Sequence, residues 1–87
     1  MAAVVRHFDE RMQVYRMGQW AHDIHQALLS LYPRVSEALV EEARAVSNLA
    51  EALAEAPTEA FADELHTVAQ QALSLSAWAS REIDNVL

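Results

Sequence analysis

The chain has 87 residues, 53% of them hydrophobic, so it is long enough for one small domain with a single core. It contains no cysteine, which excludes disulfides and thiolate chemistry. The formal net charge is −7 and every basic residue is arginine, an acidic balance that argues against binding to nucleic acids or anionic membranes.

No targeting or membrane-spanning segment is expected. The first residues hold only a short apolar run before Arg6, which lacks the apolar core of a signal peptide. No stretch approaches the ~20 apolar residues that span a bilayer. We therefore expect a soluble cytoplasmic protein. Abundant alanine without lysine is compatible with a GC-rich bacterial genome.

The first expected helix covers residues 2–32 and carries two apolar stripes whose directions differ by roughly 150° on a helical wheel. The first stripe consists of Val5, Phe8, Met12 and Tyr15. The second consists of Met17, Trp20, Ile24, Leu28 and Leu31. The change falls at Gly18, the only glycine in the chain. Because one straight helix cannot turn both stripes toward one core, either the helix breaks near Gly18 or its halves pack against different partners.

Residues 1–16 form the only net-positive part of the chain, with a charge of +1 against −8 for the remainder. Three apolar stripes, which begin at Met17, Val35 and Phe61, can close a bundle without these residues. We therefore expect residues 1–16 to be an arm. The arm either folds back as a fourth helix or docks on a second subunit, and we favour the second subunit.

The polar residues Gln19, His22 and Gln26 continue the direction of Met12 and Tyr15 along the same helix. If the helix is continuous, these side chains line the same interface as the first stripe and make it partly polar. The other possibility is simple exposure to solvent.

Two prolines divide the rest of the chain, and each is expected to open a new helix after a tight turn: Pro33 and Pro57. The helix over 34–56 has an apolar stripe of Val35, Leu39, Val46, Leu49 and Leu53. Thr58 is the expected N-cap of the helix over 58–86. Trp78 lies off the stripe of that helix, so it either covers an edge of the bundle or belongs to an interface.

The sequence therefore predicts an all-α fold, an antiparallel three-helix bundle with an N-terminal helical arm. The whole chain, residues 1–87, forms one domain. Within it the arm covers 1–16 and the bundle helices cover 17–32, 34–56 and 58–86.

The histidines offer a minor hypothesis of metal binding. His22 and His25 lie three residues apart on one helix, and His66 or a carboxylate could complete a divalent-metal site from another helix. The favoured interpretation is that the two histidines lie beside the core and are hydrogen-bonded to neighbours or water, because the paired Glu-x-x-His motifs of di-iron bundles are missing. We therefore expect no cofactor.

No motif identifies catalytic residues, since one glycine cannot build a phosphate loop and no serine lies in a nucleophile motif. Surplus apolar side chains off the bundle stripes instead indicate a non-enzymatic interaction or oligomerisation module that acts through helix–helix contacts, with a homodimer favoured. The expected interface residues are Val5, Phe8, Met12, Tyr15, Trp20 and Trp78. An alternative is an acidic inhibitor or antitoxin-like binder that occupies a basic site on a partner protein.

Overall fold

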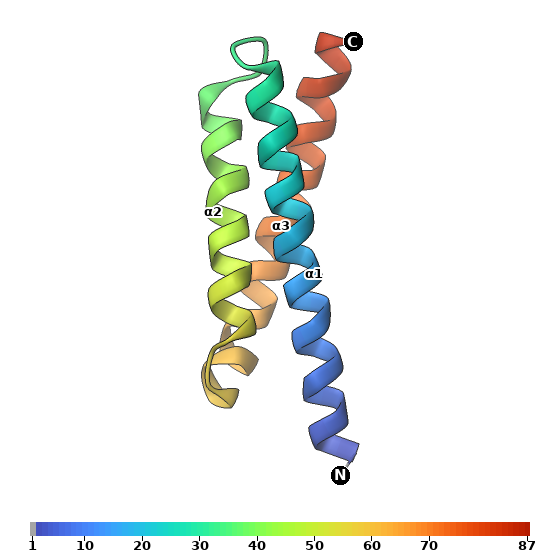
Figure 1. Ribbon diagram of the computed structural model, residues 1–87, viewed down its shortest axis with the longest axis vertical. Helices are drawn as coiled ribbons and strands as arrows, with labels where there is room; N and C mark the ends of the chain where they lie inside the picture. The colour runs from blue at the N-terminus through green and yellow to red at the C-terminus, as the bar shows by residue number, and fades with distance from the viewer. Residues whose placement is uncertain (1) are drawn as a thin grey trace.

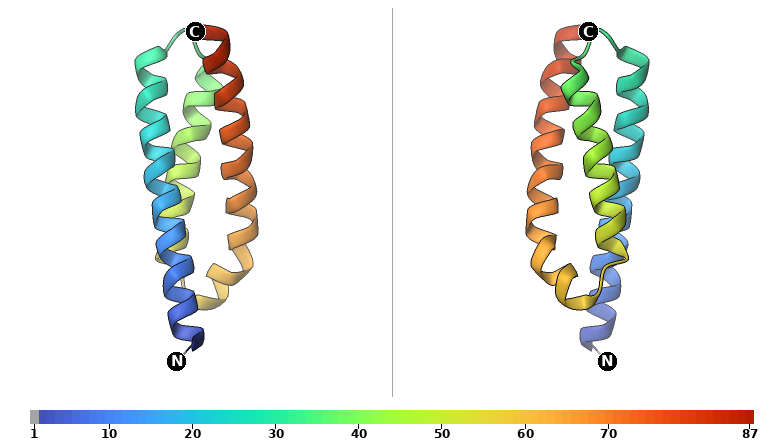
Figure 2. Two further views of the ribbon diagram at one scale, coloured as in Figure 1. Left: turned by 90° about the vertical axis from the view of Figure 1, so that its right-hand side faces the viewer. Right: turned by 90° about the vertical axis from the view of Figure 1, so that its left-hand side faces the viewer.

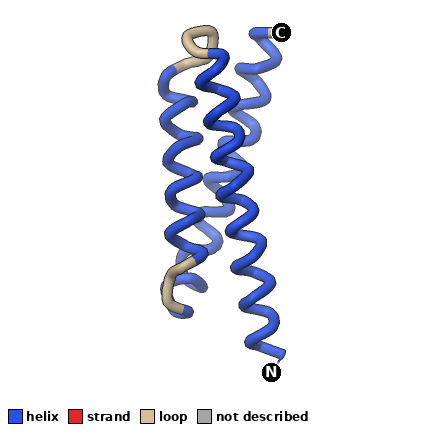
Figure 3. The backbone as a smooth tube through the Cα atoms, viewed as in Figure 1, coloured by secondary structure: helices blue, strands red, loops and turns tan. Residues whose placement is uncertain are grey.

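Residues 2–87 fold into three antiparallel helices joined by two short turns (Figure 1). The computed structural model describes the backbone of residues 2–87 and the side chains of residues 9–87. Helix α1 spans Ala2–Leu31, α2 spans Glu37–Ala54 and α3 spans Thr58–Val86. Within residues 2–87 the backbone contains no strand (Figure 3). The all-α three-helix bundle is confirmed.

The bundle is elongated, with principal extents of 48 × 17 × 17 Å. Helix α2 packs along both α1 and α3, whereas few Cα atoms of α1 come within 8 Å of those of α3. Figure 2 shows α1 and α3 on either side of α2, and the first turns of α1 extend beyond the turn that joins α2 to α3 (Figure 1). Among the described residues, no helix has both the length and the apolar character needed to cross a membrane.

Helix α1 continues without interruption through Gly18. Of the two alternatives, the break at Gly18 is therefore not observed, and the separate fourth helix that it would allow does not form within residues 2–87. Gly18 is buried because α1 and α2 approach closely there. A Cβ atom added to Gly18 would lie 3.3 Å from the Cβ of Ala50, and the Ser47 hydroxyl donates a hydrogen bond to the Gly18 carbonyl at 3.3 Å. The glycine thus marks a helix–helix contact.

The bundle also includes residues that the sequence assigned to the arm. Val14 is 1% exposed and belongs to the core cluster that contains Ala50, Leu53 and Phe61. Val14, Gly18, Ala21 and Leu28 follow heptad spacing along α1 and are all buried. Two of these four residues, Gly18 and Ala21, are very small. The pattern of large apolar residues therefore does not indicate the face that α1 presents to α2.

A larger core cluster fills the rest of the bundle and contains Leu28, Val35, Leu39, Val46 and Leu75. These residues lie on the stripes that the sequence assigned to the core. Leu49 is an exception because its side chain is 40% exposed. Where α2 contacts α1 closely, Ala43, Ser47 and Ala50 lie at the centre of the buried face of α2. Leu49 therefore lies at the edge of that face.

Helix α2 starts a few residues after the expected position, whereas α3 starts at the expected residue and differs only in its N-cap. Pro33 lies in the turn, and α2 begins at Glu37, with Ser36 as its N-cap. The N-cap position of α3 is Pro57, and Thr58 is its first helical residue, so Thr58 is not the N-cap. The reason is that the Pro57 carbonyl accepts the first helical hydrogen bond, from the Phe61 N–H at 2.8 Å.

Candidate interaction surface

Six exposed side chains form a straight row on the side of α1 that faces away from the core. We name this row the outer stripe, and it consists of Met12, Tyr15, Gln19, His22, Gln26 and Leu29. Its residues alternate at intervals of three and four, which keeps their side chains in line along a helix that packs on a neighbour. Met12, Tyr15 and Leu29 are 39%, 49% and 48% exposed. The row is therefore apolar at both ends and polar in the middle.

The outer stripe joins two features that the sequence presented separately. Met12 and Tyr15 belong to the first apolar stripe, and the polar residues 19, 22 and 26 continue it because α1 is one helix. Val5 and Phe8 continue the same spacing in the sequence, but their side chains lie outside the described residues.

Two hollows lie between α1 and α2, beside the outer stripe. The first has a volume of about 270 Å³ and is lined by Gly18, Gln19, His22, Ser47 and Glu51. The second has a volume of about 230 Å³ and is lined by Leu29, Tyr32, Glu37, Val40 and Glu41. Since both hollows are bounded by the same two helices, we refer to them together as the α1–α2 groove.

The first hollow brings together a serine, a histidine and a glutamate, the residue types of a hydrolytic triad. The Ser47 hydroxyl, however, donates its proton to the Gly18 carbonyl. A serine nucleophile needs its proton directed to a base. The three side chains therefore share a hollow without the hydrogen bonding that would activate Ser47.

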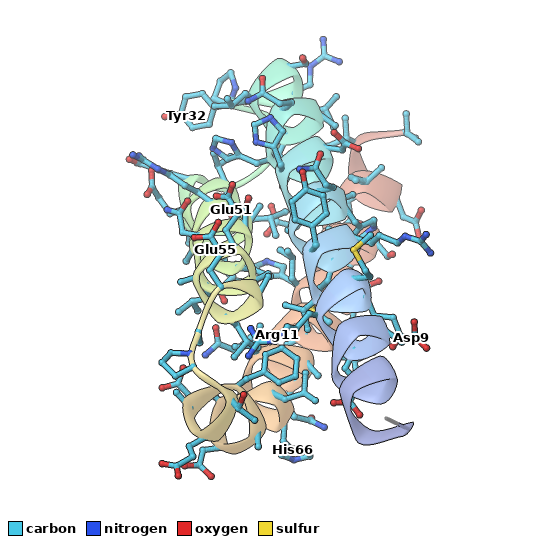
Figure 4. The ribbon with its side chains drawn as sticks, turned by 60° about the horizontal axis from the view of Figure 1, so that its bottom comes forward. Asp9, Arg11, Tyr32, Glu51, Glu55 and His66 are labelled. Atoms are coloured by element: carbon cyan, nitrogen blue, oxygen red, sulfur yellow. The ribbon has the colours of Figure 1, made fainter. Side chains whose placement is uncertain are left out.

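The α2 side of the groove is acidic. Glu37 and Glu41 line the second hollow and Glu51 lines the first, and helical spacing places Glu55 one turn beyond Glu51. Glu51 and Glu55 lie on the same side of the bundle as Tyr32 (Figure 4). Arg44 is the only basic residue of α2, so this side of α2 carries a net negative charge.

The two tryptophans expected at an interface lie at the edges of the bundle. Trp20 of α1 and Trp78 of α3 are half-buried and pack against the larger core cluster. The indole N–H of Trp78 donates a hydrogen bond to Glu82, one turn along α3. Trp78 thus lies at an edge of the bundle, and its place in an interface stays a prediction.

Glu82 connects α3 to the start of α2. Its carboxylate accepts a hydrogen bond from the Ser36 backbone N–H at 2.7 Å and another from the Ser36 hydroxyl at 2.8 Å. The Ser36 hydroxyl oxygen also accepts from the Leu39 N–H at 3.2 Å, as an N-cap does. The bonds from the Ser36 N–H and hydroxyl hold the pKa of Glu82 below its ordinary value of 4.5 against the opposing effect of desolvation, and Trp78 and Arg81 lower it further.

Arg11 connects α1 to the opposite end of the bundle. Its guanidinium donates a hydrogen bond at 2.9 Å to the carbonyl of Ala54, the last residue of α2. It also lies over the Phe61 ring, 4.6 Å from the ring centroid, within the range of a cation–π contact. Figure 4 shows Arg11 reaching toward α2 and α3. A cation at a helix C-terminus is favourable because the helix dipole is negative there.

The histidines do not assemble a metal site in the part of the chain with described side chains. That part contains no group of three or more histidine, aspartate or glutamate side chains that could hold a metal ion. His22 and His66 are exposed and His25 is half-buried. His66 lies on α3 near the turn from α2 (Figure 4), whereas His22 and His25 lie on α1.

Sequence reasoning missed the groove and the two connections made by Arg11 and Glu82. Each connection joins residues more than forty positions apart, and no periodicity in the sequence points to such a pair. Leu29 carried a usable signal, because it continues the spacing of Met12 and Tyr15 at the far end of α1.

Comparison of the chain with protein-family models, with curated proteins and with solved structures gives no match.

Proposed function

We propose that this protein is a small helix–helix interaction module that acts by binding through the outer stripe of α1. The observation that carries the proposal is the exposure of Met12, Tyr15 and Leu29 on a helix whose opposite side already supplies the core. Aligned apolar side chains at alternating intervals of three and four suit docking of another helix. A homodimer, favoured from the sequence, is one form that such binding would take.

A second candidate function is that of an acidic binder that occupies a basic site on a partner protein. Glu37, Glu41 and Glu51 on the α2 side of the groove support this candidate. The two candidates differ in their dependence on salt. Binding dominated by exposed charges weakens as salt screens them, whereas apolar helix packing resists moderate salt.

The proposed function can be tested with one substitution and one matched control. Tyr15→Glu places a charge in the outer stripe, and Leu73→Glu places the same charge on α3 at a leucine that is 65% exposed. Sedimentation equilibrium measures self-association of the full chain. Fluorescence anisotropy measures binding of two labelled amphipathic peptides that share one apolar face and carry either arginine or glutamate beside it.

We expect at least one of these associations to occur and to be lost with Tyr15→Glu but kept with Leu73→Glu. Circular dichroism melting curves check that both variants remain folded. If the full chain neither self-associates nor binds either peptide in a way that depends on Tyr15, the proposed function is wrong.

A further inference from the structure

We propose that the α1–α2 groove binds a basic amphipathic helix of another protein, with apolar side chains of that helix on the outer stripe and its basic side chains on the glutamates of α2. This inference rests on the proposed function and adds the chemistry of the partner. The proposed binding surface has two edges. One is the outer stripe of α1, and the other, which we name the acidic edge, consists of Glu37, Glu41 and Glu51 on α2.

The apolar ends of the outer stripe set the length of the partner helix. Tyr15 and Leu29 lie fourteen positions apart on a continuous helix, a span of about 21 Å at 1.5 Å per residue. Tyr32 and Val40 extend the apolar surface in the hollow beside Leu29. A helix of about 15 residues or more can therefore place apolar side chains at both ends.

The middle of the groove requires polar groups from the partner. Gln19, His22 and Glu51 line the first hollow, and Gln26 follows on the outer stripe. Amide, imidazole and carboxylate groups that are covered by another helix need hydrogen-bond partners, since burying them without one is costly. A partner with polar side chains between two apolar ends satisfies them, and a uniformly apolar helix does not.

The acidic edge determines the sign of the charge on the partner. Glu37 and Glu41 flank the second hollow and Glu51 flanks the first, which places carboxylates along one side of any helix in the groove. Arginine or lysine on that side of the partner gives complementary charge, which accelerates association and selects against acidic partners.

The same charges disfavour an antiparallel second copy of this chain as the occupant. On the α1 wheel, Gly18, which contacts α2, lies about 70° from the centre of the outer stripe. In a symmetric dimer whose two α1 helices run antiparallel through that stripe, the twofold axis would bring the two α2 helices side by side. Their glutamates would then face each other with Arg44 as the only basic residue of each α2 helix. Like charges at such short range oppose the association.

The experiment uses the full chain and the two peptides described above, each about 18 residues long and with polar side chains in the middle of the apolar face, so that they match the polar middle of the groove. The double variant Glu41→Gln, Glu51→Gln removes two charges from the groove. The matched control Glu59→Gln, Glu64→Gln removes two charges from α3, where both residues are exposed. Both variants have the same net charge, so they separate a local effect from a general attraction to an acidic protein.

We expect the full chain to bind the arginine peptide in preference to the glutamate peptide. The groove variant should weaken that binding about tenfold, because each exposed charge pair contributes a factor of roughly 2 to 5. The α3 control should leave it within about twofold, and Leu29→Ala should weaken it as well.

The sign of the charge effect separates this inference from a homodimer. Neutralising Glu41 and Glu51 weakens binding of a basic helix, but it strengthens an antiparallel symmetric dimer by removing repulsion between the two α2 helices. Tyr15-dependent self-association that becomes tighter in the groove variant would overturn the inference and leave the proposed function standing. Equal loss of peptide binding in the groove variant and the α3 control would also overturn it, as would preference for the glutamate peptide.

Discussion

At the scale of single residues, the contact at Gly18 sets the distance between α1 and α2. The backbone approach is so close that an added Cβ atom would lie 3.3 Å from the Ala50 Cβ and 3.6 Å from the Glu51 backbone nitrogen. Alanine at this position would gain about 1 kcal/mol in helix propensity over glycine, but the added methyl group has little room. Shape, more than propensity, therefore explains the glycine.

We predict that Gly18→Leu lowers the free energy of unfolding by about 1–3 kcal/mol, because the larger side chain forces the two helices apart. Ala27→Leu, at an exposed position of α1, serves as the control and should change it by less than about 0.5 kcal/mol. Urea unfolding followed by circular dichroism measures both. Equal stability of the two variants would contradict the close contact at Gly18.

Glu82 gives a prediction about pH at the same scale. The hydrogen bonds from Ser36 lower the pKa of Glu82 in the folded protein. The ionised carboxylate therefore stabilises the fold in full at pH values above its ordinary pKa of 4.5. The contribution is lost as the pH falls through the lowered pKa. Glu82→Gln should therefore be less stable than the wild type at neutral pH, and the difference should shrink at pH values below 4.5.

Chemical unfolding at a series of pH values measures this difference. The control is the Ser36→Ala background, which removes the hydroxyl that donates to the carboxylate. There the effect of Glu82→Gln should be smaller at neutral pH. A difference that stays constant from neutral pH to well below 4.5 would show that the carboxylate of Glu82 does not act in this way.

At the scale of the helices, periodicity predicted the number, order and direction of the elements. The stripes through Leu39, Val46, Phe61 and Leu75 are buried as expected. Large apolar residues at heptad spacing lie on one face of a helix, and in a short chain that face can be buried only against the neighbouring helices. The ends of the helices were less predictable. A proline can open a helix or lie in the turn before it, and Ser36, with its hydrogen bonds to Leu39 and Glu82, decides where α2 starts.

Helix α1 shows what periodicity cannot provide. A glycine between two stripes is compatible with a break or with a close contact, and the outcome depends on Ser47 and Ala50 in another helix. The candidate surface was predictable in part. The row from Met12 to Gln26 follows from spacing once α1 is known to be continuous, whereas the acidic edge formed by Glu41 and Glu51 depends on how α2 packs beside it.

At the scale of the whole molecule, the charge of −7 acts on stability and on binding in opposite directions. Within one chain, an excess of like charges opposes the compact state, and salt reduces that repulsion. Across the α1–α2 groove, the same carboxylates attract a basic helix, and salt reduces that attraction too. Raising the salt concentration should therefore raise the melting temperature of the isolated protein while it weakens binding of the arginine peptide.

Both quantities can be followed in one salt series, with circular dichroism melting for stability and fluorescence anisotropy for binding. Binding of the arginine peptide should weaken over this series because the screening length falls from about 30 Å at 0.01 M to about 10 Å at 0.1 M salt. Glu41→Gln, Glu51→Gln should bind with a smaller dependence on salt than the wild type, because fewer charges remain in the groove. The α3 control should keep the wild-type dependence. Peptide binding that is insensitive to salt in the wild type would mean that apolar packing on the outer stripe acts without help from the α2 glutamates.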